Sequence, residues 1–150
     1  MKVYHGSSVA VNVPEIRRGR FSKDFGEGFY CATLLEQAKR WASRKKPSMV
    51  SVYEYLPSEG LKVLEFTEMT DEWLDFIVKC RSGIGHDYDI VIGAMANDQV
   101  FNYINDYIEG ILTKEQFWVL AKFKRPTHQI CFSTSKALES LTYMESFNLE

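Results

Sequence analysis

Apolar residues recur along the chain with two different periods, which predict a mixture of strands and helices. Strand patterns occupy 2–5, 28–32, 50–55, 61–66, 89–93 and 128–132, each bounded by glycine, proline or polar residues. Helical spacing occupies 34–45, a segment from 70, a segment from 97 or 98 to 110, a segment from 113, and a last helix from 135. Because helices alternate with strands that include hairpin-like neighbours, notably 50–55 with 61–66 as an antiparallel pair, the pattern predicts an α+β fold.

Local motifs predict where several helices begin. Thr33-x-x-Glu36 and Thr113-x-x-Gln116 have the spacing of a capping box, and Thr70 is placed to cap a third helix. Between the first two strands, residues 12–27 are rich in proline, glycine and charge. This composition predicts an exposed loop, and long loops in compact domains are usually functional.

Length and composition narrow the class of protein. The 150 residues favour one domain spanning 1–150, and 45% hydrophobic residues exclude a disordered chain. No run approaches the roughly 20 apolar residues of a membrane helix, and no signal core is evident, so we expect a cytoplasmic protein without a membrane partner. A net charge of −2 argues against a broad nucleic-acid surface. Three cysteines without metal-ligand spacing predict free thiols and no metal.

Three segments carry side chains suited to binding or catalysis, each on or beside a predicted strand. In Tyr4-His5-Gly6-Ser7, an imidazole stands next to a glycine whose backbone a flat ligand can approach. Residues 23–30, KDFGEGFY, lack both phosphate-loop fingerprints but place two glycines before an aromatic pair. Gln129, if buried on its strand, needs partners or a ligand. Each segment also has a purely structural interpretation, as turn glycines, core aromatics or a satisfied strand residue.

The three segments together resemble the His-Tyr-Glu class of ADP-ribosyltransferases, which includes diphtheria-toxin-like enzymes and the poly(ADP-ribose) polymerases. YHGS, then GEGFYCAT, then a helix bearing an aromatic residue carry this likeness. The chain looks closer still to a family of small bacterial ADP-ribosyltransferase-like toxins that share YHGS, KDFGxGFY, an ANDxxF-like segment and HQICF. The resemblance covers essentially the whole chain. It implies an ADP-ribosyltransferase-like fold: two small, mainly antiparallel sheets around an NAD cleft, with flanking helices.

The same resemblance implies roles for individual residues. His5 would hydrogen-bond the 2′-hydroxyl of the nicotinamide ribose, and Gly6 would offer its backbone to the nicotinamide amide. Tyr30 matches the tyrosine of the GxGxY motif, and Trp41 would sandwich nicotinamide against it, although Trp41 also fits a core stripe of its helix. Arg20 lies in a loop whose basic residues are expected either to face solvent or to contact the pyrophosphate of NAD. The implied NAD-binding set is His5, Gly6, Ser7, Gly28, Phe29, Tyr30, Trp41 and Arg20, and the implied catalytic set is His5, Tyr30 and Gln129.

Gln129 departs from the family pattern, which has glutamate at this position. A glutamate stabilises the positive charge that develops on the ribose, whereas a glutamine orients the hydroxyl without charge. This difference disfavours polymer elongation and favours transfer of a single ADP-ribose. Asp24, Glu27 and Asp98 are the carboxylates that folding could bring near, although Asn97 and Asp98 also fit a plain helix cap.

The leading hypothesis is therefore a mono-ADP-ribosyltransferase that splits NAD and modifies a macromolecular acceptor, protein or nucleic acid, as the toxin of a bacterial toxin–antitoxin pair. Its alternatives are a non-catalytic module that binds NAD or ADP-ribose, and an NAD glycohydrolase. On every version we expect His5, Tyr30 and Gln129 to line one cleft.

Overall fold

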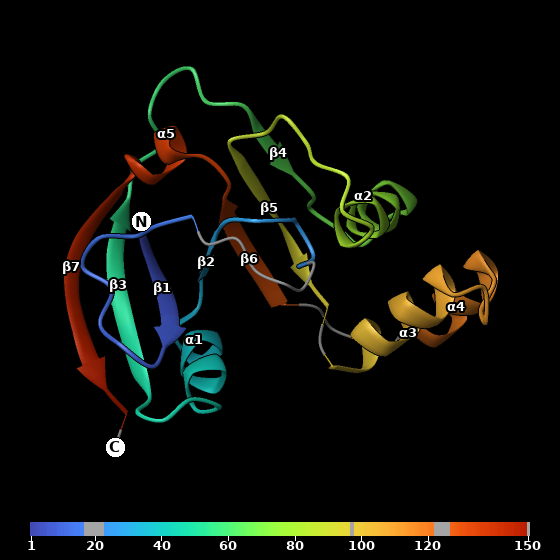
Figure 1. The fold of residues 1–150 in the computed structure, drawn as a ribbon, viewed down its shortest axis with the longest axis horizontal. Helices are drawn as coiled ribbons and strands as arrows, with labels where there is room; N and C mark the ends of the chain where they lie inside the picture. The colour runs from blue at the N-terminus through green and yellow to red at the C-terminus, as the bar shows by residue number, and fades with distance from the viewer. Residues whose placement is uncertain (17–22, 97, 122–126, 150) are drawn as a thin grey trace.

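A seven-stranded sheet forms the centre of the computed structural model, which describes residues 1–16, 23–96, 98–121 and 127–149 (Figure 1). The sheet consists of β1 (Lys2–Ser7), β2 (Phe29–Ala32), β3 (Met49–Tyr55), β4 (Val63–Glu65), β5 (Ile90–Met95), β6 (Thr127–Phe132) and β7 (Leu141–Asn148). The helices are α1 (Leu35–Ala42), α2 (Asp71–Arg81), α3 (Asp98–Ile108), α4 (Lys114–Ala121) and α5 (Ser135–Leu138). This mixture confirms the predicted α+β class.

The sheet has two halves that meet where β1 and β2 touch. Its spatial order is β4-β5-β6-β2-β1-β3-β7, and every described pairing is antiparallel except that of β4 with β5. β1 pairs with β3 along its whole length but with β2 only at Tyr4 and Ala32. Figure 1 shows β1, β3 and β7 on one side of this junction and β4, β5 and β6 on the other. The prediction of two separate sheets is not confirmed, because β2 pairs with both β1 and β6 and makes the described strands continuous.

Helix α1 packs directly on one face of the sheet at this junction. Its Ala38 and Ala42 form a buried cluster with sheet residues that include Ala32 and Val50. A Cβ atom at Gly6 would lie 2.5 Å from the carbonyl oxygen of Ala38. Glycine at position 6 is therefore required for the close approach of α1 to β1.

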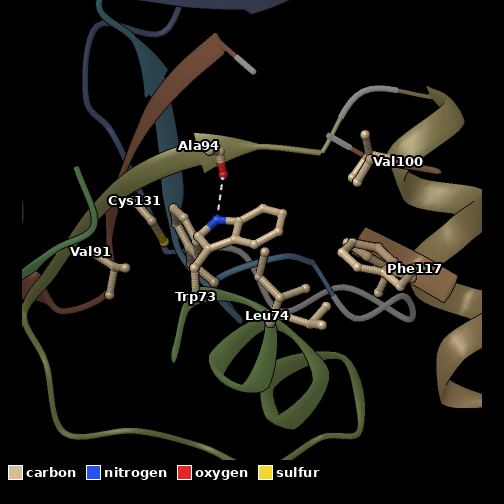
Figure 2. Close-up of a cluster of buried hydrophobic side chains, with 11 residues drawn as sticks. Trp73, Leu74, Val91, Ala94, Val100, Phe117 and Cys131 are labelled. Atoms are coloured by element: carbon tan, nitrogen blue, oxygen red, sulfur yellow. Dashed lines mark hydrogen bonds between the residues drawn. The ribbon is translucent and has the colours of Figure 1, made fainter. Parts of the chain in front are cut away.

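Helix α2 packs beside the β4–β5–β6 half, and α3 and α4 pack against each other and α2 beyond the end of these strands (Figure 1). Trp73 and Leu74 of α2, Val100 of α3 and Phe117 of α4 belong to one buried cluster, which Figure 2 shows. The indole nitrogen of Trp73 donates to the carbonyl oxygen of Ala94 at 3.1 Å, which fastens α2 to β5. Within the described ranges, no helix has the length and apolar character needed to cross a membrane.

One strand pairing differs from the sequence prediction. The segment 61–66 does not form a hairpin with 50–55; β4 instead pairs in parallel with β5, and β3 lies far along the sheet between β1 and β7. The carboxylate of Asp89 accepts a hydrogen bond from the backbone N–H of Lys62 at 2.8 Å, which helps hold β4 beside β5. A contact between distant residues thus overrides the short connection that suggested a hairpin.

The end of the chain also differs from the prediction. The last helix ends at Leu138, and β7 follows as an edge strand on β3. The ring of Tyr143 meets that of Tyr53 at a centroid distance of 5.9 Å. Partly buried Leu141 and Tyr143 alternate with exposed neighbours, which is the period of a strand rather than of a helix.

Candidate functional site

His5 stands at the place where β1 and β2 separate, and its ring connects the two strands. Its Nδ1 lies 2.6 Å from the carbonyl oxygen of Tyr30. Because a carbonyl oxygen only accepts, Nδ1 carries the proton and Nε2 is the acceptor nitrogen of the neutral ring. The imidazole also stacks on Phe29, with a centroid distance of 4.2 Å and an interplanar angle of 24°. β2 therefore fixes both the orientation and the tautomer of His5.

The side chain of Tyr30 lies on the opposite face of β2 from Phe29. Successive strand residues alternate in direction, and Tyr30 packs on the cluster beside α2 whereas Phe29 belongs to the cluster on the other face. The phenol donates to the carbonyl oxygen of Gly26 and accepts from the backbone N–H of Phe25, the latter at 3.2 Å. The ring beside His5 is thus that of Phe29, and Tyr30 is held by the turn that precedes its strand.

The phenol of Tyr30 stays neutral. Burial, followed by the nearby thiol of Cys131, raises the pKa of Tyr30 far above its ordinary value. The ammonium of Lys23 lies 5.1 Å from the centre of the ring. The Tyr30 ring is therefore suited to pack against a ligand, and its phenol does not exchange a proton near neutral pH.

A buried ion pair anchors the turn that holds Tyr30. Asp24 Oδ1 accepts from the guanidinium of Arg81, with 3.1 Å to Nε, and Oδ2 accepts from the backbone N–H of Ala96 at 3.1 Å. The side chains of Asp24 and Arg81 are only 9% and 7% exposed. This part of 12–27 is therefore not the exposed loop that composition predicted. Both oxygens of Asp24 are engaged, so Asp24 does not supply the carboxylate missing at position 129.

Gln129 occupies the strand next to β2 and is 4% exposed. Its register partners are Ala32 on β2 and Gly93 on β5. Because register partners share a face, Gln129 lies beside Ala32 on the face that α1 covers. Its Nε2 is buried without a hydrogen-bond partner. Such an orphaned donor costs about 1–3 kcal/mol, a cost that a bound acceptor removes.

The three predicted catalytic residues come together as strands but not on one face. Strands β1, β2 and β6 are neighbours in the sheet. Tyr30 pairs with Cys131, which is two residues from Gln129 on β6. Since residues two apart on a strand point to the same face, Tyr30 and Gln129 share a face. The ring of His5 lies at the junction and stacks toward the other face.

The remaining residues of the implied NAD set occupy varied positions. A Cβ at Gly28 would lie 2.5 Å from Cys131 Sγ, so this glycine lets β2 approach β6 closely. Ser7 donates to the carbonyl oxygen of Val9 at 2.6 Å. Trp41 is 49% exposed, so the core interpretation of this residue is wrong, and the guanidinium of Arg44 lies 5.5 Å from the centre of its ring. Arg20 and Asn97 lie outside the described residues.

Gln37 on α1 is a residue that the sequence analysis missed. It is 6% exposed, and both its Nε2 and its Oε1 are buried without a partner. Among the described residues, unpartnered buried side-chain nitrogen and oxygen atoms belong only to Gln37 and Gln129. Its neighbour in the chain, Ala38, faces the sheet. Its place next to Ala38, on the apolar side of the helix, was the signal in the sequence that the side chain of Gln37 could be buried.

The cysteines and the metal prediction add little to the site. Cys31, Cys80 and Cys131 are free and buried, as predicted. Burial raises the pKa of Cys131 to about 11 and that of Cys80 to about 12. In the part of the chain that the structure describes, no group of metal-ligating side chains suits an ion.

Comparison with known protein families assigns the chain to one of them. A family model described as "Protein of unknown function (DUF3990)" matches residues 1–143. The chain belongs to the DUF3990 family. The region matched by the DUF3990 model includes His5, Tyr30, Gln37 and Gln129, so the whole candidate site falls within it. A search of curated proteins found no match.

Proposed function

We propose that this DUF3990 chain is a cytoplasmic mono-ADP-ribosyltransferase of the ADP-ribosyltransferase-like fold. It cleaves NAD, transfers ADP-ribose to a macromolecular acceptor, and acts as the toxin of a bacterial toxin–antitoxin pair whose antitoxin is a protein. The order and spacing of YHGS, KDFGEGFY and HQICF motivate the proposal. The observation that carries it is the buried, unpartnered Nε2 of Gln129, two strands from the anchored imidazole of His5.

NAD is the substrate in this scheme, and the sheet junction supplies the groups that orient it. The bond between the nicotinamide nitrogen and ribose C1′ breaks, nicotinamide leaves with the electron pair, and positive charge develops on the ribose. Gln129 donates from Nε2 to a ribose hydroxyl oxygen, and His5 contacts the nucleotide from the junction where β1 and β2 separate. A nucleophile of the acceptor then bonds to C1′ and loses its proton.

Two aromatic side chains provide the flat surfaces of the proposed site. Tyr30 is neutral and held by Gly26 and Phe25, so its ring position does not depend on a ligand. Trp41 is exposed, and the nicotinamide ring would stack on the indole that the guanidinium of Arg44 also contacts. Fixed rings lower the entropy that binding a flat ligand costs.

A second candidate function, a non-catalytic NAD or ADP-ribose module, draws on a different observation. Gln129 carries no charge, and the buried carboxylate nearest in the chain to the GxGFY motif, Asp24, is already paired with Arg81. A site without a free carboxylate binds the dinucleotide but stabilises the developing ribose cation less. Hydrolysis of NAD by water, the third hypothesis, uses the same pocket as transfer.

Variants of Gln129 separate these functions. Gln129→Ala should lower NAD turnover by about tenfold to a thousandfold while NAD affinity falls only modestly, because the lost hydrogen bond orients the ribose for cleavage of the bond to nicotinamide. Gln129→Glu should keep or raise turnover, because a carboxylate adds charge stabilisation. NAD consumption, NAD affinity and melting temperature are measured on the same preparations, with Gln99→Ala on the exposed side of α3 as the matched control.

The outcomes are distinct. Wild-type protein that binds NAD without turnover, while Gln129→Glu gains turnover, would identify a non-catalytic module. Equal losses of melting temperature in both Gln129 variants, with activity per folded molecule intact, would show that Gln129 is only structural. Wild-type protein that neither binds nor consumes NAD would refute the proposed function.

A further inference from the structure

Gln37 presents both ends of a side-chain amide in a buried position without any partner. Its Nε2 and Oε1 lack hydrogen bonds, and the side chain is 6% exposed. Buried polar side-chain atoms nearly always have a protein or water partner. An amide with both ends unmet is therefore matched by a ligand that offers one acceptor and one donor side by side.

The position of Gln37 connects it to the candidate site. Ala32 lies between the two unpartnered glutamines: it packs with Ala38, the residue after Gln37, and is the register partner of Gln129. Gln37 and Gln129 consequently lie over the same face of the sheet, one from the helix and one from the strand. Helix α1 contacts β1, β2 and β3, so both amides belong to the side of the sheet that this helix covers.

Trp41 adds a flat surface next to the amide of Gln37. Residues four apart in a helix are neighbours on its surface, so Trp41 lies one turn beyond Gln37 on the same side of α1. The indole is 49% exposed, whereas the amide is out of contact with water. A ligand that enters past the indole, displacing the side chains that cover the amide, meets a stacking ring first and a hydrogen-bonding amide second.

We propose that Gln37, in place of the backbone of Gly6, against which α1 packs closely, reads the carboxamide of the nicotinamide ring of NAD and sets the specificity of the site for that group. A carboxamide has one carbonyl acceptor and one amino donor, so it pairs head to tail with a glutamine amide through two hydrogen bonds. Stacking on Trp41 would hold the pyridine ring in the plane that this pairing needs. The inference rests on the proposed function and extends it to a residue outside the motifs.

Binding measurements with wild-type protein and Gln37→Met test this role. Methionine has nearly the volume of glutamine but offers no amide. NAD affinity should fall by about tenfold to a hundredfold, the effect of losing two neutral hydrogen bonds, while affinity for ADP-ribose, which lacks nicotinamide, should stay unchanged. The wild-type preference for NAD over its 3-acetylpyridine analogue, which lacks the amino donor, should shrink in the same variant. Gln99→Met at an exposed site of α3 is the matched control.

Thermal unfolding without ligand supplies an independent readout. Replacing an unpartnered buried amide with an apolar side chain of similar shape should leave the melting temperature unchanged or raise it. A lower melting temperature with equal losses for NAD and ADP-ribose would make Gln37 structural and overturn the inference. Undiminished NAD affinity in Gln37→Met would overturn it while leaving the proposed function intact. Wild-type protein that binds neither probe would overturn both.

Discussion

Removing the carboxylate of Asp24 should destabilise the fold strongly. In Asp24→Ala the guanidinium of Arg81, 7% exposed, loses its counter-ion, and the backbone N–H of Ala96 loses its acceptor. Leaving one member of a buried ion pair unpaired costs about 3–5 kcal/mol. For a chain of this size, 1 kcal/mol shifts the melting temperature by about 2–4 °C, so the expected drop is about 6–20 °C.

Denaturant and thermal unfolding of four proteins test this reasoning. They are the wild type, Asp24→Ala, the double variant Asp24→Leu with Arg81→Met, and Asp75→Ala. The double variant should recover much of the lost stability because no unpaired charge remains. Asp75→Ala breaks the exposed pair with Lys114 and should change the free energy of unfolding little, because solvent screens it.

The same perturbation should reach the candidate site. Asp24 anchors the turn whose Phe25 and Gly26 hold the phenol of Tyr30. NAD affinity of Asp24→Ala should therefore fall even well below its melting temperature. A loss below about 1 kcal/mol, the size expected of a surface pair, would refute the argument. So would a double variant as unstable as the single one, since the unpaired charge would then not be the cause.

Two further predictions concern single side chains. His5→Ala should cut NAD turnover by about tenfold to a thousandfold, because one positioned hydrogen bond in the transition state is lost; unchanged turnover in folded protein would remove His5 from the site. The thiols should react slowly with an aromatic disulfide reagent at pH 8, because burial raises the pKa of Cys131 to about 11 and that of Cys80 to about 12, so the thiolate forms only at much higher pH. Denaturant should make all three cysteines reactive, and rapid labelling of a native thiol would contradict the buried placement.

Features set by a few neighbouring residues could be predicted from the sequence. The capping box at Thr113 and Gln116 forms both of its hydrogen bonds, at 2.9 and 3.2 Å, and Thr70 accepts from the backbone N–H of Trp73 at 3.2 Å. The box proposed at Thr33 does not form, because α1 begins after Leu34, which has no side chain able to cap it. Even a local capping motif therefore fails to form when the helix begins one residue away from the predicted position.

Features set by register could not be read in this way. Phe29 and Tyr30 point to opposite faces of β2, and the pairing of β2 with β1 and β6 decides which of the two lies beside His5. Gln129 drew notice because a polar residue is unusual on a buried strand. Gln37 did not, because polar residues are common on helices, and only the contact of Ala38 with the sheet shows that this side of α1 is covered.

Incubating the pure protein with a bacterial lysate and NAD labelled in the adenylate part tests whether the chain transfers ADP-ribose. We expect label to be retained in protein or nucleic acid after denaturing separation, with much less label retained for His5→Ala and Gln129→Ala. Free labelled ADP-ribose alone would contradict transfer and indicate a glycohydrolase. Intact NAD after incubation with folded wild-type protein and lysate would contradict catalysis altogether.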